Sequence, residues 1–172
     1  FRNEEATARA LDGEGWFDTG DLGRLDERGE LHILGRVKET IVLAGGENVE
    51  PAPLEEAICS SPMVCRAVLV GQDRKHLSAF IVPDRERLRE AVPEERWEMG
   101  EGIIRGKAVT GVLREELDRI CRDVNGFRPH ERVAQFKVLA RDFSCGEETL
   151  TPTLKVRRHK VVEKYGWLLE GE

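Results

Sequence analysis

The middle of the chain carries apolar runs in a pattern typical of buried strands. Residues 65–71 and 77–82 are almost continuously apolar, and the polar residues 72–75 separate them. Short apolar runs bounded by turn-forming residues favour buried strands. A further run, Phe136–Leu139, indicates a third strand that returns to the same sheet. We therefore predict a central sheet of about three strands.

Helical periodicity predicts the elements that flank this sheet. Residues 108–124 place apolar side chains three and four positions apart, which predicts a long amphipathic helix. Segment 84–98 is dense in both charge signs and predicts a solvated helix lying on the sheet. Pro53 suits the first turn of another helix, and residues 156–165 predict a last one. These helices and the sheet together predict an α+β fold.

A β-hairpin is predicted ahead of the sheet. Leu22–Leu25 and Leu31–Leu34 are short apolar runs, and the charged loop between them contains Gly29. Two such runs joined by a short glycine-containing loop are typical of a hairpin, here over residues 22–35. Before it, residues 1–14 predict a short helix or a loop.

The glycine-rich segment Gly100–Ala108 does not fit a phosphate-binding loop. A Walker loop needs glycine five positions before its Gly-Lys pair and Ser or Thr after the lysine, but Glu101 and Ala108 stand there. We therefore interpret the segment as a flexible linker.

Composition excludes two functional classes. With 40% hydrophobic and 35% charged residues, the chain fits a folded domain, and its net charge of −6 argues against a dedicated nucleic-acid binder. No apolar run approaches the roughly 18 residues that span a bilayer. The sequence starts at Phe1 with neither an initiator Met nor a signal peptide, so we expect a piece of a longer protein.

The cysteines and histidines do not form a metal-binding pattern. No two of the four cysteines have the two-residue spacing of a zinc knuckle, and the four histidines are scattered. We expect no metal site and reduced thiols, as in a cytoplasmic protein, with disulfides as the alternative.

Several groups suited to a nucleotide lie close together early in the chain. Thr19-Gly20-Asp21 alone is also typical of a plain turn, but its position before the predicted hairpin favours a role for Asp21 in accepting hydrogen bonds from ribose hydroxyls. Arg36 follows the predicted hairpin. Gly45-Gly46 permits a tight turn or a close approach of the backbone to another surface.

A second candidate is Lys155, at the other end of the chain. Pro152 breaks regular structure, so we expect Lys155 at the end of an exposed loop just before the last helix. Residues 155–164 contain five Lys or Arg and one Glu, which is also typical of a plain solvated face.

These motifs, in this order, resemble the adenylate-forming acyl-CoA synthetases, in the long-chain fatty acid–CoA ligase branch. The residues that carry the resemblance are Gly15–Gly23, Leu31–Glu39, Ile41–Pro51 and Leu150–Arg158. The resemblance covers nearly the whole chain but only the final part of the family's enzyme.

The resemblance implies a role for each matching residue. Asp21 and Arg36 would bind the nucleotide, and Lys38 would be the hinge. Gly45, Gly46 and Glu47 would form a loop facing the CoA tunnel, and Lys155 would be the catalytic lysine of adenylation. One departure is Leu154, because most of the superfamily has Gly before this lysine.

The resemblance also implies an organisation and a reaction. Residues 1–37 would form the distal edge of a large N-terminal adenylation domain, and residues 38–172 a mobile C-terminal lid. The full-length enzyme would convert fatty acid, ATP and CoA into acyl-CoA, AMP and pyrophosphate, with Mg²⁺. Its partners would be its own N-terminal domain and these substrates, with peripheral membrane contact allowed. This fragment alone would be inactive.

Two alternatives remain open. The parent enzyme could load its acyl group onto a carrier protein instead of CoA. The chain could also be a non-catalytic interaction module with the same fold. Acyl chain length is not encoded here, because the acyl pocket would lie upstream.

Overall fold

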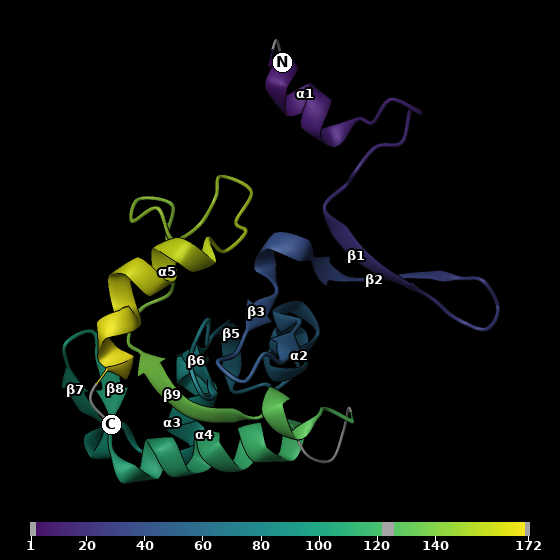
Figure 1. The fold of residues 1–172 in the computed structure, drawn as a ribbon. Coiled ribbons are helices and arrows are strands. Elements are labelled where there is room, and N and C mark those ends of the chain that lie inside the picture. Colours follow the sequence, from purple (N-terminus) through teal and green to yellow (C-terminus); the bar gives the residue numbers. More distant parts are fainter. Residues whose placement is uncertain (1–2, 122–125, 171–172) are drawn as a thin grey trace.

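The computed structural model describes residues 3–121 and 126–170. Figure 1 shows an N-terminal arm, residues 3–36, that extends away from the rest of the described chain. We call the part from residue 41 onward, which contains the central sheet, the sheet domain. The arm contains helix α1 (Glu4–Ala10) and a hairpin of strands β1 (Asp21–Leu25) and β2 (Leu31–Arg36). The hairpin predicted over residues 22–35 is confirmed, with Leu25 paired to Leu31 beside its loop.

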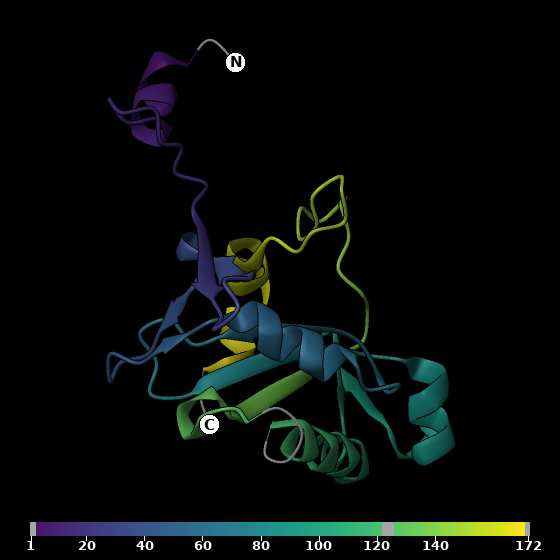
Figure 2. The same ribbon diagram turned by 90° about the vertical axis from the view of Figure 1, so that its right-hand side faces the viewer.

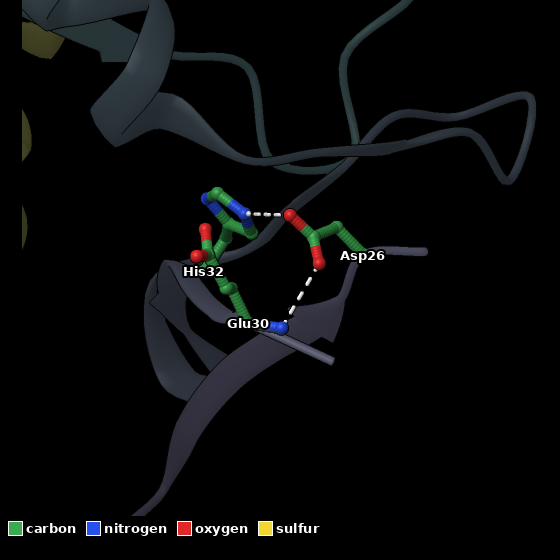
Figure 3. A group of neighbouring side chains, drawn as sticks. All are labelled: Asp26, Glu30 and His32. Atoms are coloured by element: carbon green, nitrogen blue, oxygen red, sulfur yellow. Dashed lines mark hydrogen bonds and ion pairs between the residues drawn. The ribbon is translucent and has the colours of Figure 1, made fainter. Parts of the chain in front are cut away.

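A carboxylate closes the tip of this hairpin. Asp26 Oδ1 accepts hydrogen bonds from the backbone N–H groups of Arg28 and Glu30, each at 2.9 Å. His32 Nε2 lies 3.0 Å from Asp26 Oδ2, and this contact holds the pKa of Asp26 below its ordinary value (Figure 3). Potential ligand atoms of Asp26, Glu30 and His32 lie within 4.8 Å of one another. Their hydrogen bonds account for the cluster as a loop-closing device.

The central sheet has five strands in the order β5-β6-β9-β8-β7. The three predicted strands are present, and only the β6–β9 pair is parallel. The bounds are β5 (Val64–Val70), β6 (Leu77–Pro83), β9 (Val133–Leu139), β8 (Ile103–Arg105) and β7 (Glu98–Gly100).

The prediction of a flexible linker over Gly100–Ala108 is wrong. Strands β7 and β8 form a hairpin whose two loop residues, Glu101 and Gly102, have φ of 53° and 78°. Two consecutive positive φ values match the right-handed twist of paired strands, which is why such loops join hairpins. Gly102 therefore serves a tight turn that extends the sheet, whereas Gly100 lies in β7 and Gly106 precedes the helix that begins at Lys107.

Two separate apolar clusters cover the two faces of the sheet, because successive strand residues point to opposite sides. In β6, Leu77, Ala79 and Ile81 belong to one cluster, whereas Phe80 and Val82 belong to the other. Helices α2 (Pro51–Cys59), α3 (Arg85–Ala91) and α4 (Lys107–Arg119) pack on the first face. Helix α5 (Arg158–Tyr165) and the 3₁₀ helix η5 (Gly166–Leu169) pack on the second (Figure 1).

The helices differ from the predictions mainly in length. The predicted helix over 84–98 ends at Ala91, and Pro93 lies just beyond it. A short 3₁₀ helix, η2 (Glu94–Arg96), follows and leads to the buried Trp97. The predicted helix over 108–124 corresponds to α4, and residues 122–124 lie outside the described part. Among the described residues, no helix has the length and apolar character needed to cross a membrane.

Short elements join the arm to the sheet domain. A 3₁₀ helix, η1 (Val37–Glu39), follows β2, and a small hairpin of β3 (Ile41–Val42) and β4 (Asn48–Val49) comes next. Further along the chain, and not part of this connection, a 3₁₀ helix, η4 (Pro129–Glu131), precedes β9. The loop between β3 and β4 contains Gly45-Gly46.

Candidate functional site

Lys155 lies at the end of a loop that is closed at its base. The Thr151 N–H donates to the Lys155 carbonyl at 2.8 Å, and the Lys155 N–H donates to Thr151 Oγ1 at 3.0 Å. Leu150 and Val156 form an isolated antiparallel bridge just behind this closure. Lys155 is exposed, and within residues 3–121 and 126–170 its hydrogen bonds are those of its backbone, with none found for its ammonium group. The loop therefore presents a cation.

The residue before this lysine has a left-handed backbone. Leu154 has φ of 60°, and its side chain is 59% exposed. A non-glycine residue in this conformation costs roughly 1–2 kcal/mol. Leu154, which stands where most of the superfamily has glycine, thus lies at a position whose backbone favours glycine. The loop keeps the left-handed geometry despite the leucine.

The other basic groups of α5 are mostly paired. Lys160 Nζ lies 2.9 Å from Glu163 and 3.7 Å from Glu148, and the hydrogen bond to Glu163 raises the pKa of Lys160. Lys164 Nζ lies 2.6 Å from Glu147. Nearby carboxylates therefore pair with Lys160 and Lys164 of the basic run over residues 155–164. Lys155 differs from these two lysines because no such carboxylate partner is found for it among the described residues.

The structure brings Asp21 and Arg36 together. They face each other at the open end of the hairpin, and Arg36 Nε lies 3.0 Å from Asp21 Oδ1. Arg36 and Lys38 also line a cavity of about 540 Å³ beneath α1, together with Thr19 and Gly20. The guanidinium retains N–H donors beyond the ion pair, and such planar donors suit phosphate or ribose oxygens.

Lys38 lies in η1, on the only covalent connection between the arm and the sheet domain in the described chain, and its side chain is exposed. Beside it, Thr40 Oγ1 donates to Glu50 Oε1 at 2.6 Å. Glu50 Oε2 is buried, and a Cβ added at Gly35 would lie 2.7 Å from it. Glycine at position 35 therefore lets this carboxylate approach the hairpin backbone closely.

The Gly45-Gly46-Glu47 segment forms the exposed loop between β3 and β4. The Gly46 N–H donates to the Leu43 carbonyl at 2.8 Å, and the Leu43 N–H donates to the Glu47 carbonyl at 2.9 Å. Gly46 has φ of 86°, which glycine adopts without strain. The plain-turn interpretation of Gly45-Gly46 therefore describes the local backbone, and residues 44–48 are exposed.

The two candidate segments lie on different sides of the sheet domain. In Figure 2 the segment that carries Lys155, coloured yellow-green, projects on one side, and the blue β3–β4 loop projects on the other. The described structure thus groups Arg36 with Lys38 around one cavity and keeps Lys155 apart from Gly45-Gly46.

One polar pair near Lys155 was not identified from the sequence. Arg158 and Glu55 form a half-buried ion pair, with Arg158 Nη1 lying 2.5 Å from Glu55 Oε1. Because the two residues stand 103 positions apart, no local pattern marks them as partners.

Comparison with known proteins gives a consistent assignment. The family described as the AMP-binding enzyme C-terminal domain matches residues 38–168. The long-chain-fatty-acid–CoA ligase FadD15 of Mycobacterium tuberculosis is 39% identical over 177 residues, which cover 99% of this chain and 28% of that protein. The long-chain-fatty-acid–CoA ligase ACSBG1 of Mus musculus is 36% identical and covers 98% of this chain, which spans 26% of its length.

Solved structures agree with this result. The adenylation domain of a carboxylate reductase from Mycobacterium chelonae has a TM-score of 0.83 at 27% identity, over 99% of this chain and 25% of that one. The corresponding domain from Segniliparus rugosus, in complex with AMP and a co-purified carboxylic acid, has a TM-score of 0.82 at 29% identity, over 99% and 25%. The chain therefore belongs to the family of AMP-binding enzyme C-terminal domains.

Proposed function

We propose that the chain is the C-terminal portion of a long-chain fatty acid–CoA ligase. Residues 38–172 form the mobile lid, and residues 1–37 the edge of a large adenylation domain. The observation that carries the proposal is Lys155, an exposed cation on a loop closed at its base and set apart from the Gly45-Gly46 loop. The names of the relatives, and the 28% and 26% of their length that the chain spans, support it.

In the first half-reaction a fatty carboxylate attacks the α-phosphorus of Mg-ATP and expels pyrophosphate. Negative charge gathers on the carboxylate and α-phosphate oxygens, so an ammonium aimed there stabilises the transition state more than the ground state. Lys155 supplies this ammonium. By comparison with single oxyanion donors, its loss costs about 10²- to 10³-fold in adenylation rate.

Asp21 and Arg36 hold the ribose and phosphate side of the nucleotide. Asp21 is the carboxylate of this pair, and it already contacts Arg36 at 3.0 Å. That arrangement does not offer a free ligand set for Mg²⁺, which usually binds substrate phosphates and one or two carboxylates. The Mg²⁺ of Mg-ATP would therefore accompany the nucleotide phosphates and would not be bound by Asp21.

In the second half-reaction the CoA thiol displaces AMP from the acyl-adenylate. Lys155 and the loop of Gly45, Gly46 and Glu47 project on different sides of the lid, so one pose cannot deliver both to the same active site. A rotation about Lys38 presents each in turn, as in other hinge closures.

Exposed apolar side chains on the arm support the proposal that an adenylation domain is its partner. Five large apolar side chains on it are more than 60% exposed, and such surfaces mark interfaces. They are Trp16, Phe17, Leu25, Leu31 and Ile33. The four cysteines are free, which is typical of proteins in a reducing compartment, and we place the full-length protein in the cytoplasm.

A carrier-protein acceptor is the second candidate. The specific observation in its favour is the similarity to adenylation domains of carboxylate reductases, one of them solved as a didomain named A-PCP, at a TM-score of 0.82. The long-chain ligases, at 39% and 36% identity, favour CoA.

An acceptor assay tests the proposal. The full-length parent protein is supplied with a long-chain fatty acid and Mg-ATP, and either CoA or a phosphopantetheinylated carrier protein. We expect an acyl-CoA thioester and a stoichiometric amount of AMP with CoA. Acyl transfer to the carrier alone would contradict the CoA assignment, and absence of AMP with either acceptor would contradict the ligase activity.

A further inference from the structure

Arg158 and Glu55 form a bidentate ion pair within the proposed lid. Arg158 Nη1 donates to Glu55 Oε1 at 2.5 Å, and Nη2 donates to Glu55 Oε2 at 3.1 Å. The two side chains are only 21% and 19% exposed. Bidentate pairs of this kind fix orientation as well as distance, and partial burial protects them from screening by salt.

The same pair closes an open edge of the sheet. Strand β5 is one of the two edge strands of the sheet, so part of its backbone has no neighbouring strand to bond. The Leu69 N–H donates to Glu55 Oε1 at 2.7 Å, and the Leu69 carbonyl accepts from Arg158 Nη1 at 2.5 Å. Four hydrogen bonds thus join α2, β5 and the start of α5.

The position of the pair in the chain connects it to both candidate segments. Arg158 follows Lys155 by three residues and begins α5. Glu55 lies in α2, which begins at Pro51, directly after the hairpin that carries Gly45-Gly46. The pair therefore ties the base of the lysine loop to the element that follows the glycine loop.

We propose that Glu55 and Arg158 are positioning residues that hold the Lys155 loop in register with the lid, so that rotation of the lid delivers the ammonium to the reacting phosphate. This proposal rests on the proposed function of Lys155. The pair acts through Lys155 and does not contact substrate. Without the pair, the lysine loop keeps its own closure at Thr151 and the packing of Val161, but loses the hydrogen bonds that fix Arg158 on β5.

The expected defect is selective for one half-reaction. A small misplacement of a catalytic group can lower a rate by about 10²-fold, so we expect adenylation kcat to fall about 10- to 100-fold. The KM for ATP should change less than kcat, because the proposed nucleotide residues lie in the hairpin. Thioester formation from supplied acyl-adenylate should stay close to the unmodified rate, because the β3–β4 loop is closed by its own hydrogen bonds.

The experiment uses the full-length parent enzyme and measures both half-reactions for each variant. Arg158→Lys keeps the positive charge but removes the planar guanidinium that donates two parallel hydrogen bonds. Glu55→Gln keeps the shape of the side chain but removes its negative charge. Arg87→Gln is the matched control, because Arg87 pairs with Glu90 at 3.0 Å in an exposed setting on α3. Thermal unfolding of every variant reports whether the lid remains folded.

Selective loss of adenylation in both pair variants, with the control unchanged, supports the proposal. Equal loss of both half-reactions, no loss of either, or failure of both pair variants to fold overturns it in favour of a purely structural pair. Lys155→Ala, measured alongside, separates the two claims. If Lys155→Ala loses adenylation and the pair variants do not, only the positioning claim fails. If Lys155→Ala keeps adenylation, the proposed function fails and the positioning claim fails with it.

Discussion

At the residue scale, the loop before the last helix combines a strained backbone with an exposed cation. Leu154 holds φ of 60°, and the next residue carries the ammonium that we propose for adenylation. The closure at Thr151 holds this conformation, since it fixes both backbone groups of Lys155. The strain is therefore local, and it can be relieved without removing a buried side chain.

We expect Leu154→Gly to stabilise the isolated chain slightly. Relief of the left-handed conformation gains roughly 1–2 kcal/mol, and the extra backbone entropy of glycine costs roughly 0.5–1 kcal/mol. The net gain in the free energy of unfolding should be roughly 0.5–1 kcal/mol, measured by urea denaturation. Val162→Gly, inside α5, is the control and should destabilise, because glycine is a poorer helix former than valine. A loss of stability in Leu154→Gly would contradict this account of the loop.

Individual residues were predictable where a local motif marks them. Lys155 was expected at the end of an exposed loop, and it lies there. Asp21 and Arg36 flank the predicted hairpin, and antiparallel pairing then places them opposite each other. The Glu55–Arg158 pair could not be predicted, because two charged residues in different helices meet only after the sheet has formed.

At the element scale, η1 is the connection about which the lid would turn. It contains three residues, Val37–Glu39, between the hairpin and β3. Lys38 is exposed, so its own side chain is not part of the core. The element has the exposure that a hinge needs, and its rotation is a testable property.

We expect Lys38→Pro in the full-length enzyme to slow one half-reaction and spare the other. Proline fixes φ near −65° and restricts the preceding residue, so one of the two lid poses becomes inaccessible. Rates of pyrophosphate release and of thioester formation from supplied acyl-adenylate give the measurement. Glu95→Pro is the matched control, because it sits in the middle of η2, a 3₁₀ helix of the same length away from the hinge. Unchanged turnover in Lys38→Pro would remove the hinge claim.

Elements were predictable where apolar runs were long. β5 and β6 coincide with near-continuous apolar runs, and α4 buries Val109, Leu113 and Leu117 at helical spacing, so each is clear in the sequence. The β7–β8 hairpin was missed because each of its strands has three residues, too few for periodicity to register. Glycines that look flexible in the sequence can instead meet the positive φ of a tight turn, as Gly102 does.

At the scale of the whole molecule, the sheet domain and the arm differ in how far they bury their apolar side chains. The sheet domain buries apolar clusters on both faces of its sheet, whereas the arm leaves apolar side chains exposed. Figure 1 shows the arm projecting from the sheet domain. This asymmetry is expected if the arm packs on a larger domain and the sheet domain moves as a lid.

The central claim is that the lid delivers Lys155 for adenylation and then turns away. Lys155→Ala in the full-length enzyme tests it most directly, with pyrophosphate release and thioester formation from supplied acyl-adenylate measured separately. We expect pyrophosphate release to fall by about 10²- to 10³-fold while thioester formation is retained. Equal loss of the two half-reactions, or unchanged pyrophosphate release, would contradict it.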